Sequence, residues 1–73
     1  MISVLDPGEP RRRLFVQDYI VVKELAELLG LRPFKVVADV MELGLFKHAD
    51  EVIDFPTAAL VGKKHGFALE RVL

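Results

Sequence analysis

Hydrophobic and polar residues recur with helical periodicity in two neighbouring stretches, which predict two short helices joined by a turn. The first stretch, residues 23–29, places leucines at helical spacing opposite two glutamates. Gly30 suits the position just after this helix, where a left-handed backbone would strain any residue with a Cβ. Pro33 suits the first turn of the second helix, since the N–H that proline lacks would have no helical partner there.

The second helix is expected to turn one broad apolar face to the core and to end at Gly44. This face consists of Phe34, Val37, Val40 and Met41, with Val36 at its margin. The residues expected to point away from the core are Lys35, Asp39 and Glu42. Ala26, Gly30 and Val36 also have the spacing of a helix–turn–helix, in which a small residue lets the helices approach and an aliphatic residue fills the gap between them.

A third helix and several short strands complete the predicted domain. Asp54 suits the N-cap of this helix, Pro56 its first turn and Gly66 the residue after its end. Strands are predicted at residues 19–21, at each end of the stretch 45–53 around a turn near Ala49 and Asp50, and at 67–72. The expected order is β-α-α-β-α-β, a small α+β domain of three helices with short strands at its ends and a helix–turn–helix-like core.

The length of 73 residues fits one domain preceded by a short tail. Pro7, Gly8 and Pro10 break any periodicity near the start of the chain. Residues 1–13 are therefore expected to be a flexible tail or the end of a linker, and residues 14–73 the folded domain. With 52% hydrophobic residues, the chain has the material for a core, although a domain of this size has a stability of only ~3–5 kcal/mol.

Composition and charge exclude several classes of protein. The chain has no cysteine, which rules out disulfides and thiolate zinc sites and fits a reducing cytoplasm. No apolar run approaches the ~20 residues of a membrane span, and the first ten residues do not form a signal peptide. A net charge of −1 argues against a dedicated binder of polyanions. We therefore expect a cytoplasmic protein with no membrane contact.

No catalytic constellation is visible in the sequence, so an enzyme is not expected. His48 and His65 are the only histidines, and a solvated loop and a solvated helix end are expected for them. Asp50, Glu51 and Asp54 do not follow the alternating oxygen ligands of an EF-hand, and a turn followed by a helix cap is the expected arrangement. We therefore expect neither a metal nor a cofactor.

Two groups of cations are the candidate contact residues. The candidate patch for an anionic partner consists of Lys47, Lys63, Lys64 and Arg71. The candidate basic arm toward nucleic acid consists of Arg11, Arg12 and Arg13. The structural alternatives are a favourable interaction with the helix dipole for the lysines and a soluble linker for the arginines.

A helix–turn–helix core raises the alternative that the chain is the DNA-binding module of a transcriptional regulator. Reading DNA requires exposed donors on the second helix and cations that hold the phosphates. The second helix offers Lys35 against Asp39 and Glu42, and these two acids would face the phosphates unfavourably. The spacing therefore fits this motif, but the charge of the helix does not.

Two longer stretches resemble the N-terminal domain of bacterial translation initiation factor 2. The first is "VVKELAELLGLRPFKVVADVMELGLF" and the second is "VIDFPTAALVGKKHGF", and they lie within the stretch from Ile20 to Phe67. Of these, "RPFKVVADVMELGLF" is the most specific. The chain departs from the family pattern at Asp50 and Glu51, where the family usually has Asn-Gln, and at Pro56, where an acidic residue is common. The role of that turn in the family is therefore not carried over.

The resemblance implies a non-catalytic accessory domain that assists interaction of the factor with the ribosome, chiefly the small subunit, or with other parts of the factor. RNA is a further contact that it implies. It also implies that the GTPase of the factor is a separate domain, joined through a long linker. Of the residues named above, the patch of Lys47, Lys63, Lys64 and Arg71 is the expected contact surface.

Overall fold

A computed structural model describes residues 12–72, and these form an α+β domain of three helices and four short strands. The elements are β1 (Arg12–Val16), β2 (Tyr19–Val21), α1 (Val22–Leu29), α2 (Pro33–Glu42), β3 (Val52–Asp54), α3 (Phe55–Lys64) and β4 (Phe67–Arg71). The predicted fold class is confirmed, with three helices in the expected places. The expected tail, residues 1–13, lies for the most part outside the described residues.

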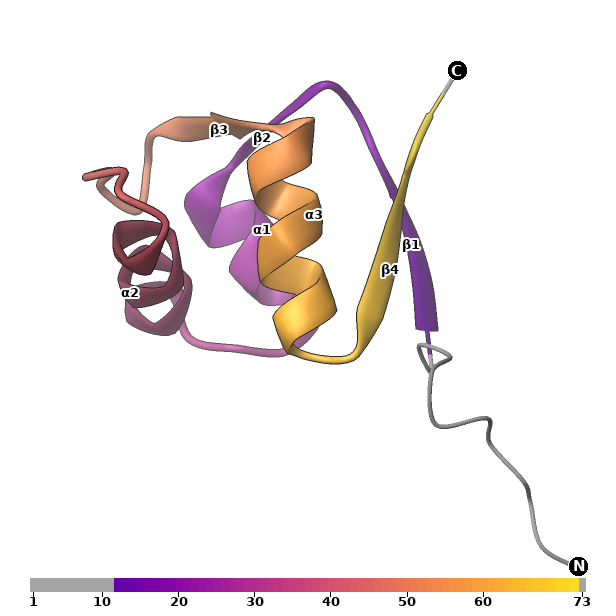
Figure 1. Cartoon of the computed structure of the whole chain (residues 1–73), viewed down its shortest axis with the longest axis horizontal. Helices are drawn as coiled ribbons and strands as arrows, with labels where there is room; N and C mark the ends of the chain where they lie inside the picture. The colour runs from indigo at the N-terminus through magenta and orange to yellow at the C-terminus, as the bar shows by residue number, and fades with distance from the viewer. Residues whose placement is uncertain (1–11, 73) are drawn as a thin grey trace, which may run out of the picture.

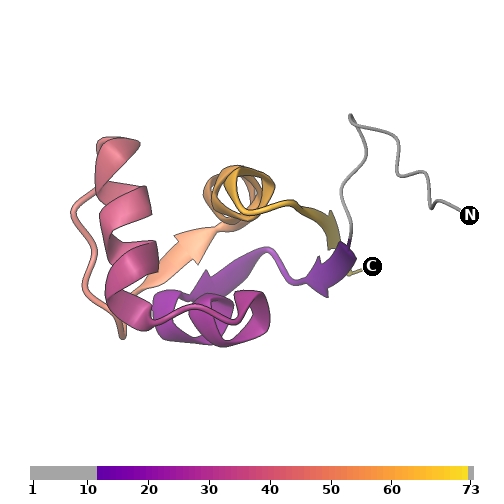
Figure 2. The same cartoon turned by 90° about the horizontal axis from the view of Figure 1, so that it is seen from below.

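The helices α1 and α3 form the centre of the domain, with α2 at one end and the strands β1 and β4 at the other (Figures 1 and 2). β2 pairs with β3 in antiparallel fashion, and β1 pairs with β4 in parallel. β2 runs directly into α1 and β3 directly into α3. The β2–β3 pair therefore holds the N-terminal ends of these two helices together.

The core is assembled from small and aliphatic side chains. Its buried members are Val16, Val22, Leu25, Ala26, Leu29, Val36, Val40, Ile53, Ala58, Val61 and Leu69. Ala26 and Val36 are fully buried, as the helix–turn–helix spacing predicts, and Gly30 has the left-handed φ of 74° that the turn requires. The predicted packing of α1 on α2 is confirmed.

The start of α3 is also confirmed in detail. Asp54 is its N-cap, and a carboxylate oxygen of Asp54 accepts a hydrogen bond of 3.0 Å from the backbone N–H of Thr57. Pro56 lies in the first turn, where the N–H that it lacks is not needed. A side chain that caps a helix satisfies a donor that the helix itself leaves unpaired, so this boundary could be predicted from the local sequence.

One strand prediction is wrong, and one strand of the structure was not predicted. The structure adds β1, which begins at Arg12 inside the segment expected to be a tail, and it has no strand at the start of the stretch 45–53. β1 is held by its parallel partner β4, from the far end of the sequence. A pairing between such distant segments leaves no local pattern, whereas three consecutive arginines and nearby prolines favour a loop.

The predicted orientation of α2 is wrong as well. Val36, expected at the margin, is fully buried, while Phe34 and Met41, expected in the core, are 69% and 49% exposed. Asp39, expected in solvent, is 3% exposed and faces inward. The helix is therefore rotated about its axis relative to the prediction. The rotation buries one charged residue and exposes two large apolar residues.

Asp39 is stabilised in the interior by two residues at the end of α3. Lys64 Nζ lies 2.9 Å from Asp39 Oδ1, and His65 Nε2 lies 2.6 Å from Oδ2. The carboxylate can only accept, so the imidazole donates from Nε2. Burial by itself raises the pKa of Asp39, but the hydrogen bonds from His65 and Lys64 and the charge on these groups outweigh it. The pKa of Asp39 therefore lies below its ordinary value of 3.8.

α3 approaches β4 closely at Gly62, a buried residue in the last part of the helix. A Cβ at this position would overlap Cδ1 of Leu69, a core residue of β4. Glycine costs stability inside a helix, so its presence here is explained by the short distance between the helix and the strand. Position 62 therefore sets how tightly α3 packs on β4.

We predict that Gly62→Val lowers the free energy of unfolding by about 1–3 kcal/mol, because the added side chain must displace Leu69. Urea unfolding followed by circular dichroism measures this change. The matched control is Lys63→Val, the same side chain at the next, exposed position, where only helix propensity changes and the cost is a few tenths of a kcal/mol. Equal effects of the two substitutions would contradict the close packing.

We predict that Asp39→Asn lowers the free energy of unfolding by about 1.5–3 kcal/mol at neutral pH, because the amide cannot reproduce both charge-assisted hydrogen bonds. A carboxyl whose pKa is depressed by folding stabilises the protein above its unfolded pKa. This contribution is lost as the pH falls through the lower, folded-state pKa. The difference in the free energy of unfolding between Asp39→Asn and the unchanged chain should therefore shrink below pH 3.8.

Urea titrations at neutral pH and near pH 3 measure this difference. Glu42→Gln is the control, since Glu42 also contacts Lys64 but is exposed, and its replacement should change stability little. If the difference in the free energy of unfolding is as large near pH 3 as at neutral pH, the ionised carboxylate is not its source.

Candidate interaction surface

The four cations of the predicted patch do not lie together in the structure. Lys63 and Lys64 occupy the last turn of α3, whereas Arg71 ends β4. β4 runs back along α3 (Figure 1), so Arg71 lies beside the start of the helix, with its guanidinium 4.9 Å from the ring centre of Phe55. A helix of ten residues is about 15 Å long, which separates Arg71 from the two lysines.

Two of these cations are already in ion pairs. Lys64 contacts Asp39 and also Glu42, whose Oε1 lies 2.5 Å from Nζ, and hydrogen bonds to Glu42 and Asp39 raise the pKa of Lys64 above its ordinary value. Arg71 Nε lies 3.1 Å from Asp18 Oδ1. The charge of Lys47 acts on Asp54, described next.

Asp54 has a depressed pKa for a structural reason. The chief cause is its hydrogen bonding with Thr57 at the start of α3, and the nearby charge of Lys47 adds to it.

Within residues 12–72, Lys63 is the member of the predicted patch that is exposed and in no ion pair. Acids of the domain itself therefore neutralise two of the four patch cations, Lys64 and Arg71.

The predicted basic arm is divided between described and undescribed residues. Arg11 lies outside the described residues, and Arg12 is the first residue of β1. Arg13, also in β1, has its guanidinium 3.3 Å from the carboxylate of Glu70 on the paired strand β4. Arg13 is therefore part of a strand and an exposed ion pair rather than of a free arm.

The histidines and the acidic turn have structural partners. His48 is exposed, and its backbone N–H donates to the carboxylate of Glu51 over 2.7 Å. His65, predicted to be solvated, is instead largely shielded and bound to Asp39. In the part of the chain that the structure describes, no three histidine or acidic side chains converge as metal ligands.

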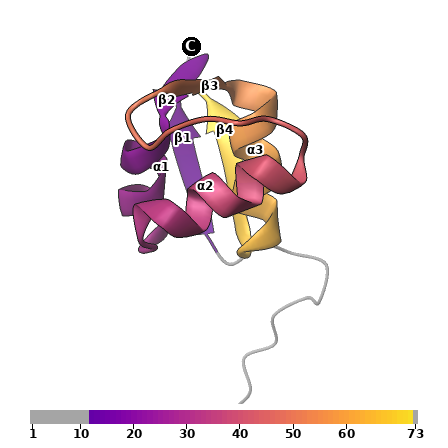
Figure 3. The same cartoon turned by 90° about the vertical axis from the view of Figure 1, so that its left-hand side faces the viewer.

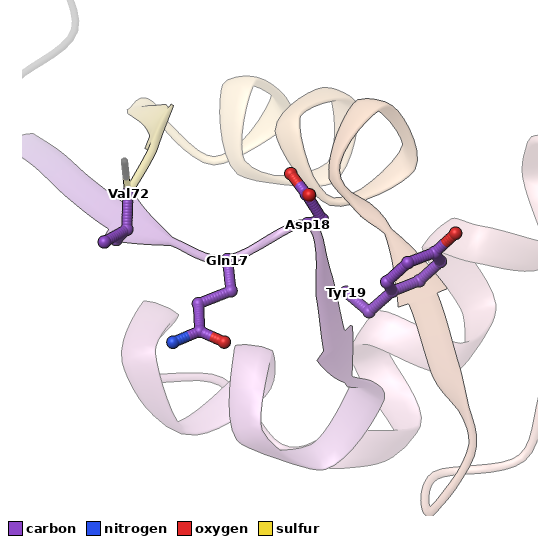
Figure 4. A pocket seen from close by; sticks show the side chains of 4 residues that line it. All are labelled: Gln17, Asp18, Tyr19 and Val72. Carbon is purple, nitrogen blue, oxygen red and sulfur yellow. The ribbon is translucent and has the colours of Figure 1, made fainter.

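A shallow hollow of about 350 Å³ lies where β1 turns toward β2, beside the end of β4. Its lining residues are Gln17, Asp18, Tyr19 and Val72. Figure 4 shows the side chains of Gln17, Asp18 and Tyr19 pointing in different directions. The carboxylate of Asp18 is already paired with Arg71. These groups do not converge on one point, so the hollow offers no arrangement for catalysis.

The outer side of α2 exposes apolar residues that the sequence places in the core. Phe34, Ala38 and Met41 are exposed and lie at positions i, i+4 and i+7, so they form one stripe along the helix. We call these three residues the α2 apolar stripe. Sequence reasoning missed this surface because it assigned Phe34 and Met41 to the core. The helix–turn–helix spacing would have found it. That spacing places Val36 in the gap beside Ala26, and a buried Val36 turns Phe34 and Met41 toward solvent.

No helix among residues 12–72 has the length and hydrophobicity needed to cross a membrane.

Residues 18–68 match the family model for the N-terminal region of translation initiation factor IF-2. The match begins just before β2, includes all three helices and ends within β4. It therefore covers the whole helical core, including the turn between α1 and α2.

Translation initiation factors IF-2 of several bacteria are similar to this chain. That of Syntrophobacter fumaroxidans is 31% identical over 70 residues, which cover 96% of the chain and 7% of the relative. That of Syntrophomonas wolfei is 34% identical over 58 residues, covering 80% of the chain and 7% of the relative. The chain thus spans less than a tenth of the length of these curated relatives. The resemblance predicted from the two sequence stretches is confirmed, and the chain belongs to the family of N-terminal regions of translation initiation factor IF-2.

Proposed function

We propose that the chain is a non-catalytic accessory domain that acts in the cytoplasm and assists the interaction of an initiation factor with the ribosome. In this proposal the α2 apolar stripe docks on a protein surface of the small ribosomal subunit. The single observation that carries the proposal is that α2 presents Phe34 and Met41 to solvent while it buries Asp39.

An apolar stripe of this kind supports contact with a protein. Large exposed apolar residues that lie next to each other are costly in water unless a partner covers them. Aromatic residues and methionine are also enriched in the centres of protein interfaces. Phe34 and Met41 are one turn on either side of Ala38, so they can enter a partner surface together.

The same surface argues against nucleic acid as the principal partner. Phosphate contacts require available cations, and the cations around α3 are mostly paired within the domain. The helix–turn–helix alternative would place α2 in the major groove, where the stripe offers Phe34, Ala38 and Met41 instead of hydrogen-bond donors. Lys63 is the exposed patch cation that stays available to a partner.

We predict that Phe34→Asp weakens binding of the chain to small ribosomal subunits by about tenfold or more, since it places a charge at the centre of the docking face. The measurement is a titration of the labelled chain with purified small subunits at low and high salt. Binding through an apolar stripe should change little between the two salt concentrations. Circular dichroism checks that the variant is folded, as an exposed position allows.

The matched control is Phe15→Asp, which makes the same change at a phenylalanine that is 64% exposed on β1, at the opposite end of the domain (Figure 1). This variant should bind like the unchanged chain. Equal binding by Phe34→Asp and the unchanged chain would refute docking through α2. Binding to the rest of the factor but not to the subunit would replace the ribosome with the factor as the partner. Salt-sensitive binding to duplex DNA that is lost with Lys35→Glu would favour the DNA-binding alternative instead.

A further inference from the structure

The α2 apolar stripe is bordered on one side by a pair of opposite charges. At 100° per residue, Lys35 and Glu42 lie next to each other around the helix, on the same side of the stripe and one near each end. Both are exposed. Glu42 contacts Lys64, while Lys35 is in no ion pair within residues 12–72.

We propose that the α2 apolar stripe binds the same stripe of a second copy of this chain, with the two α2 helices antiparallel and crossing at Ala38. Alanine at the crossing allows the helix axes to approach to about 8 Å. Phe34 of each copy then packs against Met41 of the other. Both large side chains of the stripe then become covered.

The charges select this antiparallel arrangement. A two-fold axis perpendicular to the helices places the charged side of one α2 next to the charged side of the other. The two helices then run in opposite directions, so the residues of one charged side meet those of the other in reverse order. Lys35 of each copy then faces Glu42 of the second copy, which gives two symmetric ion pairs. A parallel arrangement would instead place Lys35 and Glu42 beside the Val37 side of the other helix. Glu42 can bind Lys64 and the second copy at once, because a carboxylate accepts several hydrogen bonds.

α2 lies on an outer side of the domain, beside the segment that joins it to β3 (Figures 2 and 3). Figure 3 shows α2 lying across α1 and α3 on the side that faces the viewer. β1 and β4 lie at the opposite end of the domain (Figure 1) and take no part in the contact. One stripe is smaller than the interface of a stable dimer, so we expect weak, concentration-dependent pairing.

Pairing would also regulate the docking proposed above, because it covers the same stripe. Only this consequence rests on the proposed function. The pairing itself concerns the purified chain alone and is tested without ribosomes.

Sedimentation equilibrium of the purified chain over a wide range of concentrations tests the pairing. The unchanged chain should associate to a dimer and no further. Lys35→Glu sets two acidic groups against each other, and Glu42→Lys does the same with two basic groups. Each single variant should dimerise about tenfold more weakly. An equimolar mixture of the two variants should dimerise as the unchanged chain does, because every facing pair is again of opposite charge.

Glu42→Lys also breaks the contact between Glu42 and Lys64 within one chain. Two further variants leave that contact intact and test the pairing without it. Ala38→Glu places a charge at the crossing without altering any ion pair of the domain and should abolish the dimer. Phe15→Asp should leave it unchanged. A chain that remains monomeric at every concentration, or a mixture that associates no better than either single variant, would overturn the inference. If Phe34→Asp still impaired ribosome binding in that case, the proposed function would stand while the pairing failed.

Discussion

The burial of Asp39 between α2 and α3 is the interaction on which the arrangement of the domain depends. The carboxylate is 3% exposed and would carry a large desolvation penalty without partners. Lys64 and His65 supply two hydrogen bonds from the end of α3, and no buried side-chain polar atom of the described residues is left without a partner. A buried charge tolerates only orientations in which its partners are within reach, so Asp39 fixes the rotation of α2 as well as its position.

The rest of the core permits this arrangement because the residues at which its helices and strands touch have small side chains or none. Ala26 brings α1 to α2, Ala58 is fully buried in α3, and Gly62 lets α3 lie against β4. Small residues at these points let the helices approach closely, so even a short chain can bury its aliphatic residues together. The same closeness brings the end of α3 within hydrogen-bonding distance of α2. The small core residues and the contacts of Asp39 therefore depend on each other.

The accuracy of the sequence predictions follows the range of the interactions involved. Gly30 at the turn and Asp54 at the start of α3 act on backbone groups within a few residues, and both were predicted correctly. The partners of Asp39 are 25 and 26 residues away, and helical periodicity read this residue as solvent-facing because it is charged. The pairing of β1 with β4 and the separation of Arg71 from Lys64 likewise depend on how distant segments fold together.

The two errors on α2 have one physical origin, and it bears on function. A helix optimised only for folding would bury Phe34 and Met41 and expose Asp39, since this gains apolar burial and avoids desolvating a charge. α2 does the reverse and needs Lys64 and His65 to compensate. Departures from local consistency of this kind are expected where a surface is used for contact with another molecule. The buried carboxylate and the exposed stripe are thus one feature, in which the contacts of Asp39 with Lys64 and His65 hold an apolar helix face toward solvent.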